Sequence, residues 1–260
     1  MEWTAATREA SPGTKVWVQI GSVEEAVEVV RAVAPDVLVV QGADAGGHGL
    51  ERGAGVVSLV PEVDDKVRGV CRASVPSSLG TTKGDGKEKE DDRPEMPVLV
   101  AAGGIADARG AAAALALGAG GVVMGTRFLA THEAEISKGY RKEVVRAEDG
   151  GQSTVRTKVY DQVRGTDGWP ERYNGRGVVN RSYVDAVAGM DAEENKKLYT
   201  EEIEKGDEGW GADGRMTTYA GSAVGLVREV KPAGEVVREV REGVGGVLRR
   251  TFSAQMGGMV

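Results

Sequence analysis

The chain has 260 residues, of which 40% are hydrophobic and 28% charged, a length typical of one α/β barrel or of one large domain with an extension. Its formal net charge of −7 excludes a dominant basic surface for nucleic acid or anionic lipid, because phosphate binding needs clustered Lys and Arg. Two histidines and one cysteine are too few for a Cys/His zinc site, and no apolar run reaches the roughly 18 residues of a membrane-spanning helix.

The cysteine usage bears on the cellular compartment. Cys71 is the single cysteine and cannot form a disulfide within the chain, which is typical of a reducing cytosol. Residues 1–13 resemble neither a secretory signal nor a transit peptide. We therefore expect a cytoplasmic protein.

The first predicted unit is strand, helix, strand. Residues 15–20 form an apolar run, and Ser22 with Glu25 makes a capping box that opens a helix ending before Pro35. Residues 37–41 are a second strand. Strands without polar alternation are typical of parallel sheets covered on both faces.

The pattern then repeats after an interruption. A helix is predicted over 61–72, and residues 74–96 lose all periodicity and fill with charge, Gly and Ser, which predicts a disordered surface insertion. A third strand follows at 97–102, Asp107 caps an Ala-rich helix, and 121–125 is a fourth strand. Four such units make half of a (β/α)8 barrel or a small open α/β sheet, and periodicity alone does not choose between them.

The pattern changes after about residue 135. Residues 140–185 are polar and mixed, 191–205 is a charged helix capped by Asp191, and Pro232 begins a last helix. We expect the part from 136 to 260 to be an extension of helices and loops.

The chemistry is concentrated in the loops after the strands. In VQGADAGGHG, residues 40–49, Gln41 ends a strand and three glycines surround His48. Glycines there permit positive φ and let backbone N–H groups approach an anion or a flavin ring. The segments AAGGIAD (101–107) and MGTRF (124–128) stand at equivalent places, where N–H groups and a hydroxyl can bind a phosphate.

Three segments carry a resemblance to a known family. VQGADAGGHG, PVLVAAGGIADARGAAAALALGAGGVVMGTRFLAT and YAGSAVGLV resemble the nitronate monooxygenases, formerly called 2-nitropropane dioxygenases. The resemblance is dense over 15–135 and thinner to about 245. It implies an FMN-binding TIM barrel of the (β/α)8 family that oxidises alkyl nitronates with O2 to a carbonyl compound and nitrite.

The same resemblance implies the site residues. Gln41 and Gly46 would line the flavin and Gly104 would contact its phosphate. The neighbouring residues Gly47 and Gly103 are also expected to bind the cofactor. The last strand would hold the phosphate through Val123, Met124, Gly125 and Thr126. His48 falls on the family's active-site histidine, as a general base toward a nitroalkane C–H or as a hydrogen-bond donor to nitronate oxygens.

The chain also departs from the family's pattern. Four further strands precede the matching segment in that family, whereas residues 1–14 here do not match it, so we expect 15–135 to form only the C-terminal half of the barrel. Two exposed sheet edges would result, and a homodimer formed through them is one expectation. Alternatives are a truncated, non-catalytic remnant and an FMN-dependent enoyl-acyl-carrier-protein reductase, whose family shares the AGGH loop.

Overall fold

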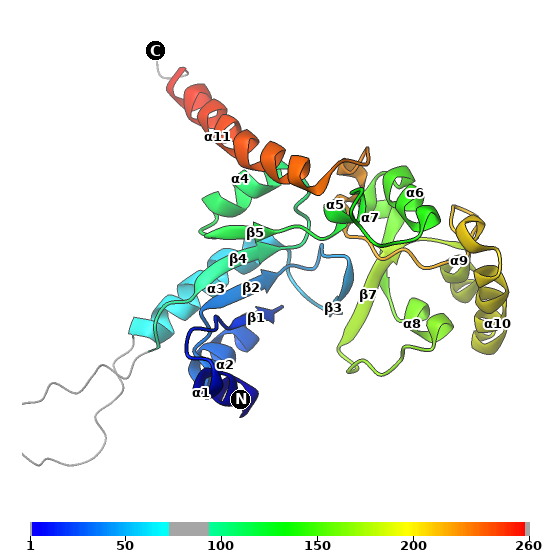
Figure 1. Cartoon of the computed structure of the whole chain (residues 1–260), viewed down its shortest axis with the longest axis horizontal. Helices are drawn as coiled ribbons and strands as arrows, with labels where there is room; N and C mark the ends of the chain where they lie inside the picture. The colour runs from blue at the N-terminus through cyan, green and yellow to red at the C-terminus, as the bar shows by residue number, and fades with distance from the viewer. Residues whose placement is uncertain (1, 73–93, 258–260) are drawn as a thin grey trace, which may run out of the picture.

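The computed structural model describes residues 2–72 and 94–257, which form a parallel sheet with its helices and a second part built on an antiparallel sheet (Figure 1). The insertion expected at 74–96 lies outside the described residues except for 94–96, which have no regular secondary structure.

The parallel sheet has four strands in the order β1-β2-β4-β5. They are β1 (Trp17–Ile20), β2 (Val37–Gln41), β4 (Val98–Ala102) and β5 (Gly121–Val123). All three pairings are parallel, so the carboxyl ends of the strands meet at one edge. This confirms the four strands and the α/β class predicted from the apolar runs.

Helices cover one face of this sheet. They are α2 (Val23–Val33), α3 (Val56–Arg72) and α4 (Ala108–Ala116). Helix α11 (Ala233–Gly257) packs on α4, and α1 (Glu2–Ala10) lies at the N-terminal end. Ser22 accepts a hydrogen bond from the N–H of Glu25 and Asp107 caps α4, as the sequence predicted. The prediction for α3 was too short at its start, because the helix begins at Val56.

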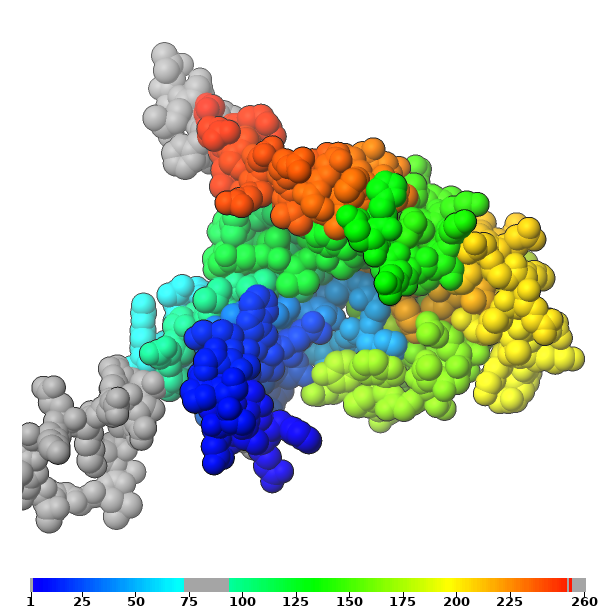
Figure 2. Space-filling view, in the orientation of Figure 1, coloured from blue at the N-terminus to red at the C-terminus, as the bar shows by residue number. Residues whose placement is uncertain are grey.

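The core of the helix-covered face is almost entirely Val, Leu, Ile and Ala. Leu38, Val40, Leu99 and Ala101 from the strands pack on Val30 of α2 and on neighbouring helix residues. Figure 2 shows α11, coloured orange to red, lying along the green segment that contains α4. The sequence placed α11 correctly from Pro232 onward.

The other face of the sheet is only partly covered. Val37, Val39 and Val100 are buried there, yet Trp17 and Val98, which flank Val37 in register, are 59% and 52% exposed. The expectation that both faces are covered therefore holds only for the middle of the sheet. At the amino-terminal ends of β1 and β4, the side chains of Trp17 and Val98 have little packed against them in the described part.

The second part surrounds an antiparallel sheet in the order β3-β7-β6. Its strands are β3 (Gly47–Leu50), β6 (Thr154–Thr157) and β7 (Tyr173–Val178). Its α-helices are α5 (Thr126–Leu129), α6 (Lys138–Arg146), α7 (Gly150–Ser153), α8 (Val159–Arg164), α9 (Arg181–Val187) and α10 (Ala192–Ile203). Two short 3₁₀ helices complete it, η1 (Gly206–Gly209) and η2 (Ser222–Leu226).

This second sheet corrects two expectations. The part from 136 to 260 contains strands β6 and β7 besides helices, and the glycine-rich loop at 47–50 is strand β3. None of the three strands β3, β6 and β7 has the alternating apolar pattern by which strands are recognised in a sequence. Strand β3 forms because its backbone pairs with β7, where His48 faces Gly175 in register. No helix in the described ranges is long and apolar enough to cross a membrane.

Candidate functional site

A cavity of about 290 Å³ opens at the carboxyl ends of β2, β4 and β5, close to the lower end of the usual range for ligand pockets. Its floor is the loops that follow these strands, and Tyr140, Tyr219 and Gly221 from the second part close it. The residues predicted to bind a cofactor that line it are Gln41, Gly46, Gly47, Gly103, Gly104, Val123, Gly125 and Thr126.

Met124 is the predicted cofactor-binding residue that the cavity does not include. Its side chain packs against the apolar cluster between the sheet and its helices. Because side chains alternate along a strand, Val123 lines the cavity while the next side chain lies on the opposite side.

The glycine loops after β2 and β4 lie against each other. Gly103 and Gly104 have φ of +96° and +73°, in the left-handed region that glycine adopts at little cost. A Cβ on Gly103 would lie 2.9 Å from the backbone nitrogen of Ala45 and from the oxygen of Gly42. The two loops therefore form one continuous backbone surface at the cavity floor.

The segment 219–222 reaches the cavity from the second part. The N–H of Gly221 donates to Oγ1 of Thr126 at 2.9 Å, and the hydroxyl of Ser222 donates to Oδ1 of Asp44 at 2.8 Å. Although Asp44 is an acid in the cavity wall, its carboxylate is thus engaged by a neighbouring hydroxyl. The sequence segment YAGSAVGLV signalled this wall only through the family resemblance.

His48 lies on β3 beside this cavity. Its Nε2 is 2.9 Å and 3.0 Å from the two carboxylate oxygens of Asp161, which belongs to α8. The imidazole stacks on Trp169 with ring centroids 3.9 Å apart and planes 8° from parallel, and the centroid of the Tyr219 ring lies 5.4 Å away. Through Tyr219 and Gly47, which line the cavity, the histidine adjoins it.

Sequence reasoning missed Asp161, Tyr219 and Trp169 as neighbours of His48. Each lies more than 100 residues further along the chain. Asp161 and Trp169 are in a polar stretch without a recognisable motif, and Tyr219 begins YAGSAVGLV, whose resemblance to a family did not indicate a contact with His48. The hydroxyl of Tyr219 donates to Asp161 at 3.0 Å. Burial, together with the nearby negative charge of Asp161, raises the pKa of Tyr219 well above its usual range, so this hydroxyl stays protonated.

Tyr140 adds a second neutral phenol to the cavity wall. Its hydroxyl donates to the carbonyl oxygen of Tyr219 at 2.8 Å, and burial raises the pKa of Tyr140 to about 12. The wall facing the glycine loops is therefore aromatic and uncharged at neutral pH.

Two arginines fix the loop that carries Gly46 and Gly47. Arg156 donates to the carbonyl oxygens of Ala45 at 2.9 Å and Asn174 at 2.8 Å, and Arg176 donates to that of Ala43 at 3.2 Å. Burial, with Arg176 nearby, lowers the pKa of Arg156 to about 10, so the guanidinium is still charged at neutral pH.

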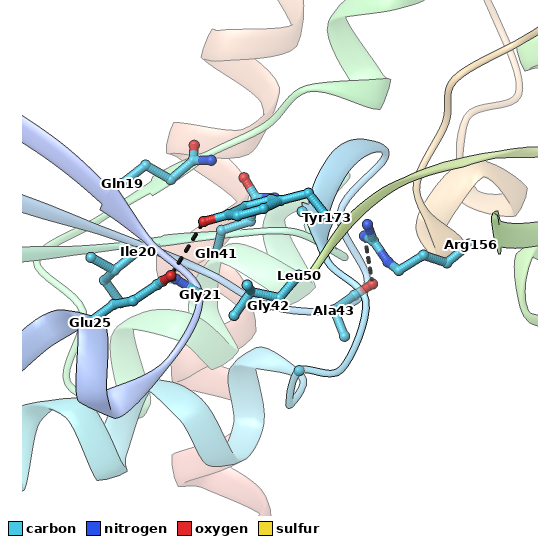
Figure 3. A pocket seen from close by; sticks show the side chains of 12 residues that line it. Gln19, Ile20, Gly21, Glu25, Gln41, Gly42, Ala43, Leu50, Arg156 and Tyr173 are labelled. Atoms are coloured by element: carbon cyan, nitrogen blue, oxygen red, sulfur yellow. Dashed lines mark hydrogen bonds between the residues drawn. The ribbon is translucent and has the colours of Figure 1, made fainter. Parts of the chain in front are cut away.

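A smaller cavity of about 40 Å³ adjoins the first and shares Gln19 and Gln41 with it. Figure 3 shows Tyr173 pointing across it to Glu25, with a hydroxyl-to-carboxylate distance of 3.2 Å, and Arg156 reaching the carbonyl oxygen of Ala43. Its size and the polar side chains among its lining residues fit one or two water molecules.

The amino-acid sequence is similar to those of known proteins. A family described as nitronate monooxygenase matches residues 4–243. The nitronate monooxygenase npaC of Metarhizium robertsii is 51% identical over 249 residues, which cover 95% of this chain and 63% of that protein. A nitronate monooxygenase of Neurospora crassa is 42% identical over 230 residues, covering 88% of this chain and 54% of that protein. The chain thus spans between 54% and 63% of the length of these two relatives.

Solved structures give the same fold. The nitroalkane oxidase of Streptomyces ansochromogenes superimposes with a TM-score of 0.67 at 26% identity, covering 96% of this chain and 62% of that one. FabK of Thermotoga maritima superimposes with a TM-score of 0.66 at 23% identity, covering 96% of this chain and 68% of that one, which is a likeness of fold alone. These likenesses confirm the TIM-barrel family predicted for the parallel sheet.

Proposed function

The chain belongs to the nitronate monooxygenase family, and on that basis we propose that it binds FMN and oxidises alkyl nitronates with O2 to a carbonyl compound and nitrite. The observation that carries the proposal is a single cavity whose floor is the glycine loops after β2 and β4 and which adjoins His48.

The cavity suits a flavin phosphate in its chemistry. Gly103, Gly104 and Gly125 present backbone without side chains, and Thr126 adds a hydroxyl. A Cβ on Gly104 would lie 3.0 Å from the Cβ of Asp44, so glycine keeps this approach open. We propose that these four residues hold the phosphate and that Gln41, Gly46, Gly47 and Val123 line the rest of the cofactor.

FMN, when bound, supplies the redox chemistry with O2. The protein's own contribution is orientation and proton handling. We propose that His48 takes the α-proton of a neutral nitroalkane or donates a hydrogen bond to nitronate oxygens. We propose that Tyr140 and Tyr219, which line the cavity, limit the access of water to the reacting centre.

The test of cofactor binding is the visible absorbance of the purified chain before and after FMN addition and gel filtration. Flavin absorbance that elutes with the protein supports the proposal, and oxygen uptake with a nitronate then tests the reaction. A protein that stays colourless would favour the alternative of a non-catalytic remnant.

The enoyl-acyl-carrier-protein reductase alternative rests on the fold likeness to FabK. Consumption of NAD(P)H with an enoyl thioester, without oxygen uptake on nitronates, would favour it. The higher identity to named nitronate monooxygenases places it second.

The open sheet edges bear on assembly. Strands β1 and β5 are the two outer strands of the parallel sheet in the described residues, and Trp17 on β1 is exposed. Unpaired edges with apolar side chains favour association, so we propose that two copies pair through them. Sedimentation at micromolar concentration tests this, since a monomer there would contradict it.

The single Cys71 also supports the proposal of a cytoplasmic location.

A further inference from the structure

The contact between His48 and Asp161 extends the proposed function and rests on it. We propose that Asp161 is the positioning residue that holds His48 as the Nε2–H tautomer, so that Nδ1 is the atom that takes the proton of a nitroalkane.

The carboxylate of Asp161 determines where the imidazole hydrogen is. Asp161 is 4% exposed, and its Oδ1 accepts hydrogen bonds from Tyr219 at 3.0 Å and from Thr166 at 3.2 Å in addition to His48. An ionised carboxylate only accepts hydrogen bonds. The nitrogen of His48 that faces it must therefore carry the hydrogen, which leaves the lone pair of the neutral ring on Nδ1.

The other ring nitrogen is available. Within residues 2–72 and 94–257, the hydrogen bonds of the His48 ring all involve Nε2. Nδ1 has no hydrogen-bond partner there, and it is not fully buried. Trp169 stacks flat on the ring and the two-oxygen contact with Asp161 fixes its edge. The ring is thus held in one orientation, and Nδ1 keeps some exposed surface.

The proton transfer that this arrangement supports is balanced within the site. The α-C–H bond of the nitroalkane breaks, its electron pair moves into the nitro group to give a nitronate anion, and an N–H bond forms at Nδ1. The imidazole becomes positively charged, and the carboxylate of Asp161 stabilises that charge through Nε2–H.

A purely structural role for Asp161 is the competing explanation, since its oxygens also anchor Thr166 and Tyr219. The substitution Asp161→Asn separates the two. The introduced amide keeps the shape and an accepting oxygen, but its NH₂ group can also donate to Nε2, so the tautomer would no longer be fixed. A structural anchor would change stability without changing where the imidazole hydrogen resides.

The experiment measures the tautomer directly, by ¹⁵N NMR of histidine-labelled chain without flavin or substrate. The chain has two histidines, so the His132→Gln variant assigns both sets of signals. Wild-type His48 is expected to show a protonated Nε2 and an unprotonated Nδ1, and Asp161→Asn is expected to produce the Nδ1–H form in a substantial fraction. A wild-type chain with Nδ1–H would overturn the proposal, even where the variant fails to fold.

Asp185→Asn is the matched control. Asp185 is likewise buried and accepts hydrogen bonds from arginines, Arg215 and Arg181, in a network outside the cavity. The substitution is expected to lower stability and to leave the His48 signals unchanged. If Asp185→Asn shifts the tautomer as much as Asp161→Asn does, the assignment to Asp161 is wrong.

Activity provides the second readout in the FMN-loaded chain. Asp161→Asn is expected to lower kcat/KM for a neutral nitroalkane by about 10²-fold and that for the preformed nitronate by less than about 3-fold. Equal losses on both substrates would contradict the role in proton transfer. A wild-type chain inactive on nitronates would refute the proposed function, while the NMR result would still decide the tautomer.

Discussion

Gly46 and Gly221 lie in backbone contact, so that a Cβ on Gly46 would be 2.5 Å from the nitrogen of Gly221. This contact joins the loop after β2 to the segment before η2 and closes the cavity. It depends on both residues being glycine, because no side chain fits between the two backbones.

Replacing Gly46 with Ala is expected to destabilise the fold by about 1–3 kcal/mol through overpacking, and to weaken FMN retention because the cavity wall moves. In a chain of this size that lowers Tm by roughly 2–10 °C. Thermal unfolding by circular dichroism measures it. The control is Gly69→Ala, in α3 with no atom within 4 Å of the added Cβ, which is expected to raise stability by about 0.5–1 kcal/mol. Equal melting temperatures for Gly46→Ala and wild type would show that the contact is not tight.

Removing the hydroxyl of Thr126 is expected to loosen the same wall. Thr126→Val leaves the N–H of Gly221 without its acceptor, at a cost of about 1 kcal/mol or more, and FMN affinity is expected to fall by about 5-fold or more. Fluorescence titration of FMN gives the Kd. Thr126→Ser retains the acceptor and is expected to bind FMN as wild type does, so weak binding by both variants would show that the hydroxyl acceptor alone does not explain the loss.

His48→Asn tests the histidine itself. If His48 is the base, oxidation of neutral nitroalkanes should fall by about 10²-fold or more, while turnover of preformed nitronates changes far less. Oxygen consumption with both substrate forms at saturating FMN provides the comparison. An equal loss on the two forms would point to hydrogen bonding of nitronate oxygens instead.

Acid stability should depend on Asp185. Burial alone would raise its pKa, but hydrogen bonds from Arg215 and Arg181 outweigh that and hold the pKa of Asp185 below its usual value of 3.8. A carboxylate whose folded pKa is depressed stabilises the fold above the unfolded pKa, and that contribution disappears as the pH falls through the folded pKa. Wild type should therefore lose more stability than Asp185→Asn as the pH falls from about 5 into the acid range.

Urea unfolding midpoints at several pH values measure this difference. The variant should be less stable than wild type at neutral pH, and the two curves should converge as the pH falls below about 4. Parallel curves over the whole range would mean that Asp185 has the same pKa in the folded and unfolded chain.

The parallel sheet could be predicted from the order of residues, because its strands are short apolar runs bounded by residues with clear local preferences. Ser22 and Asp107 cap their helices through bonds to N–H groups two or three residues away, and such local contacts need no knowledge of the fold. The predicted cofactor residues follow strands whose carboxyl ends meet at one edge, and all but Met124 line one cavity. Met124 does not, since strand alternation turns it toward the core.

The surroundings of His48 could not be predicted in this way and emerge with the three-dimensional fold. Strand β3 exists because its Gly-His-Gly backbone pairs with β7, and this pairing between distant segments leaves no periodic signal in either. The same pairing brings Asp161 and Trp169 to the imidazole, from a polar stretch with no motif. Local preferences fix helix ends and buried strands, whereas the partners of a functional side chain are set by long-range backbone pairing, for which the sequence carries no short-range pattern.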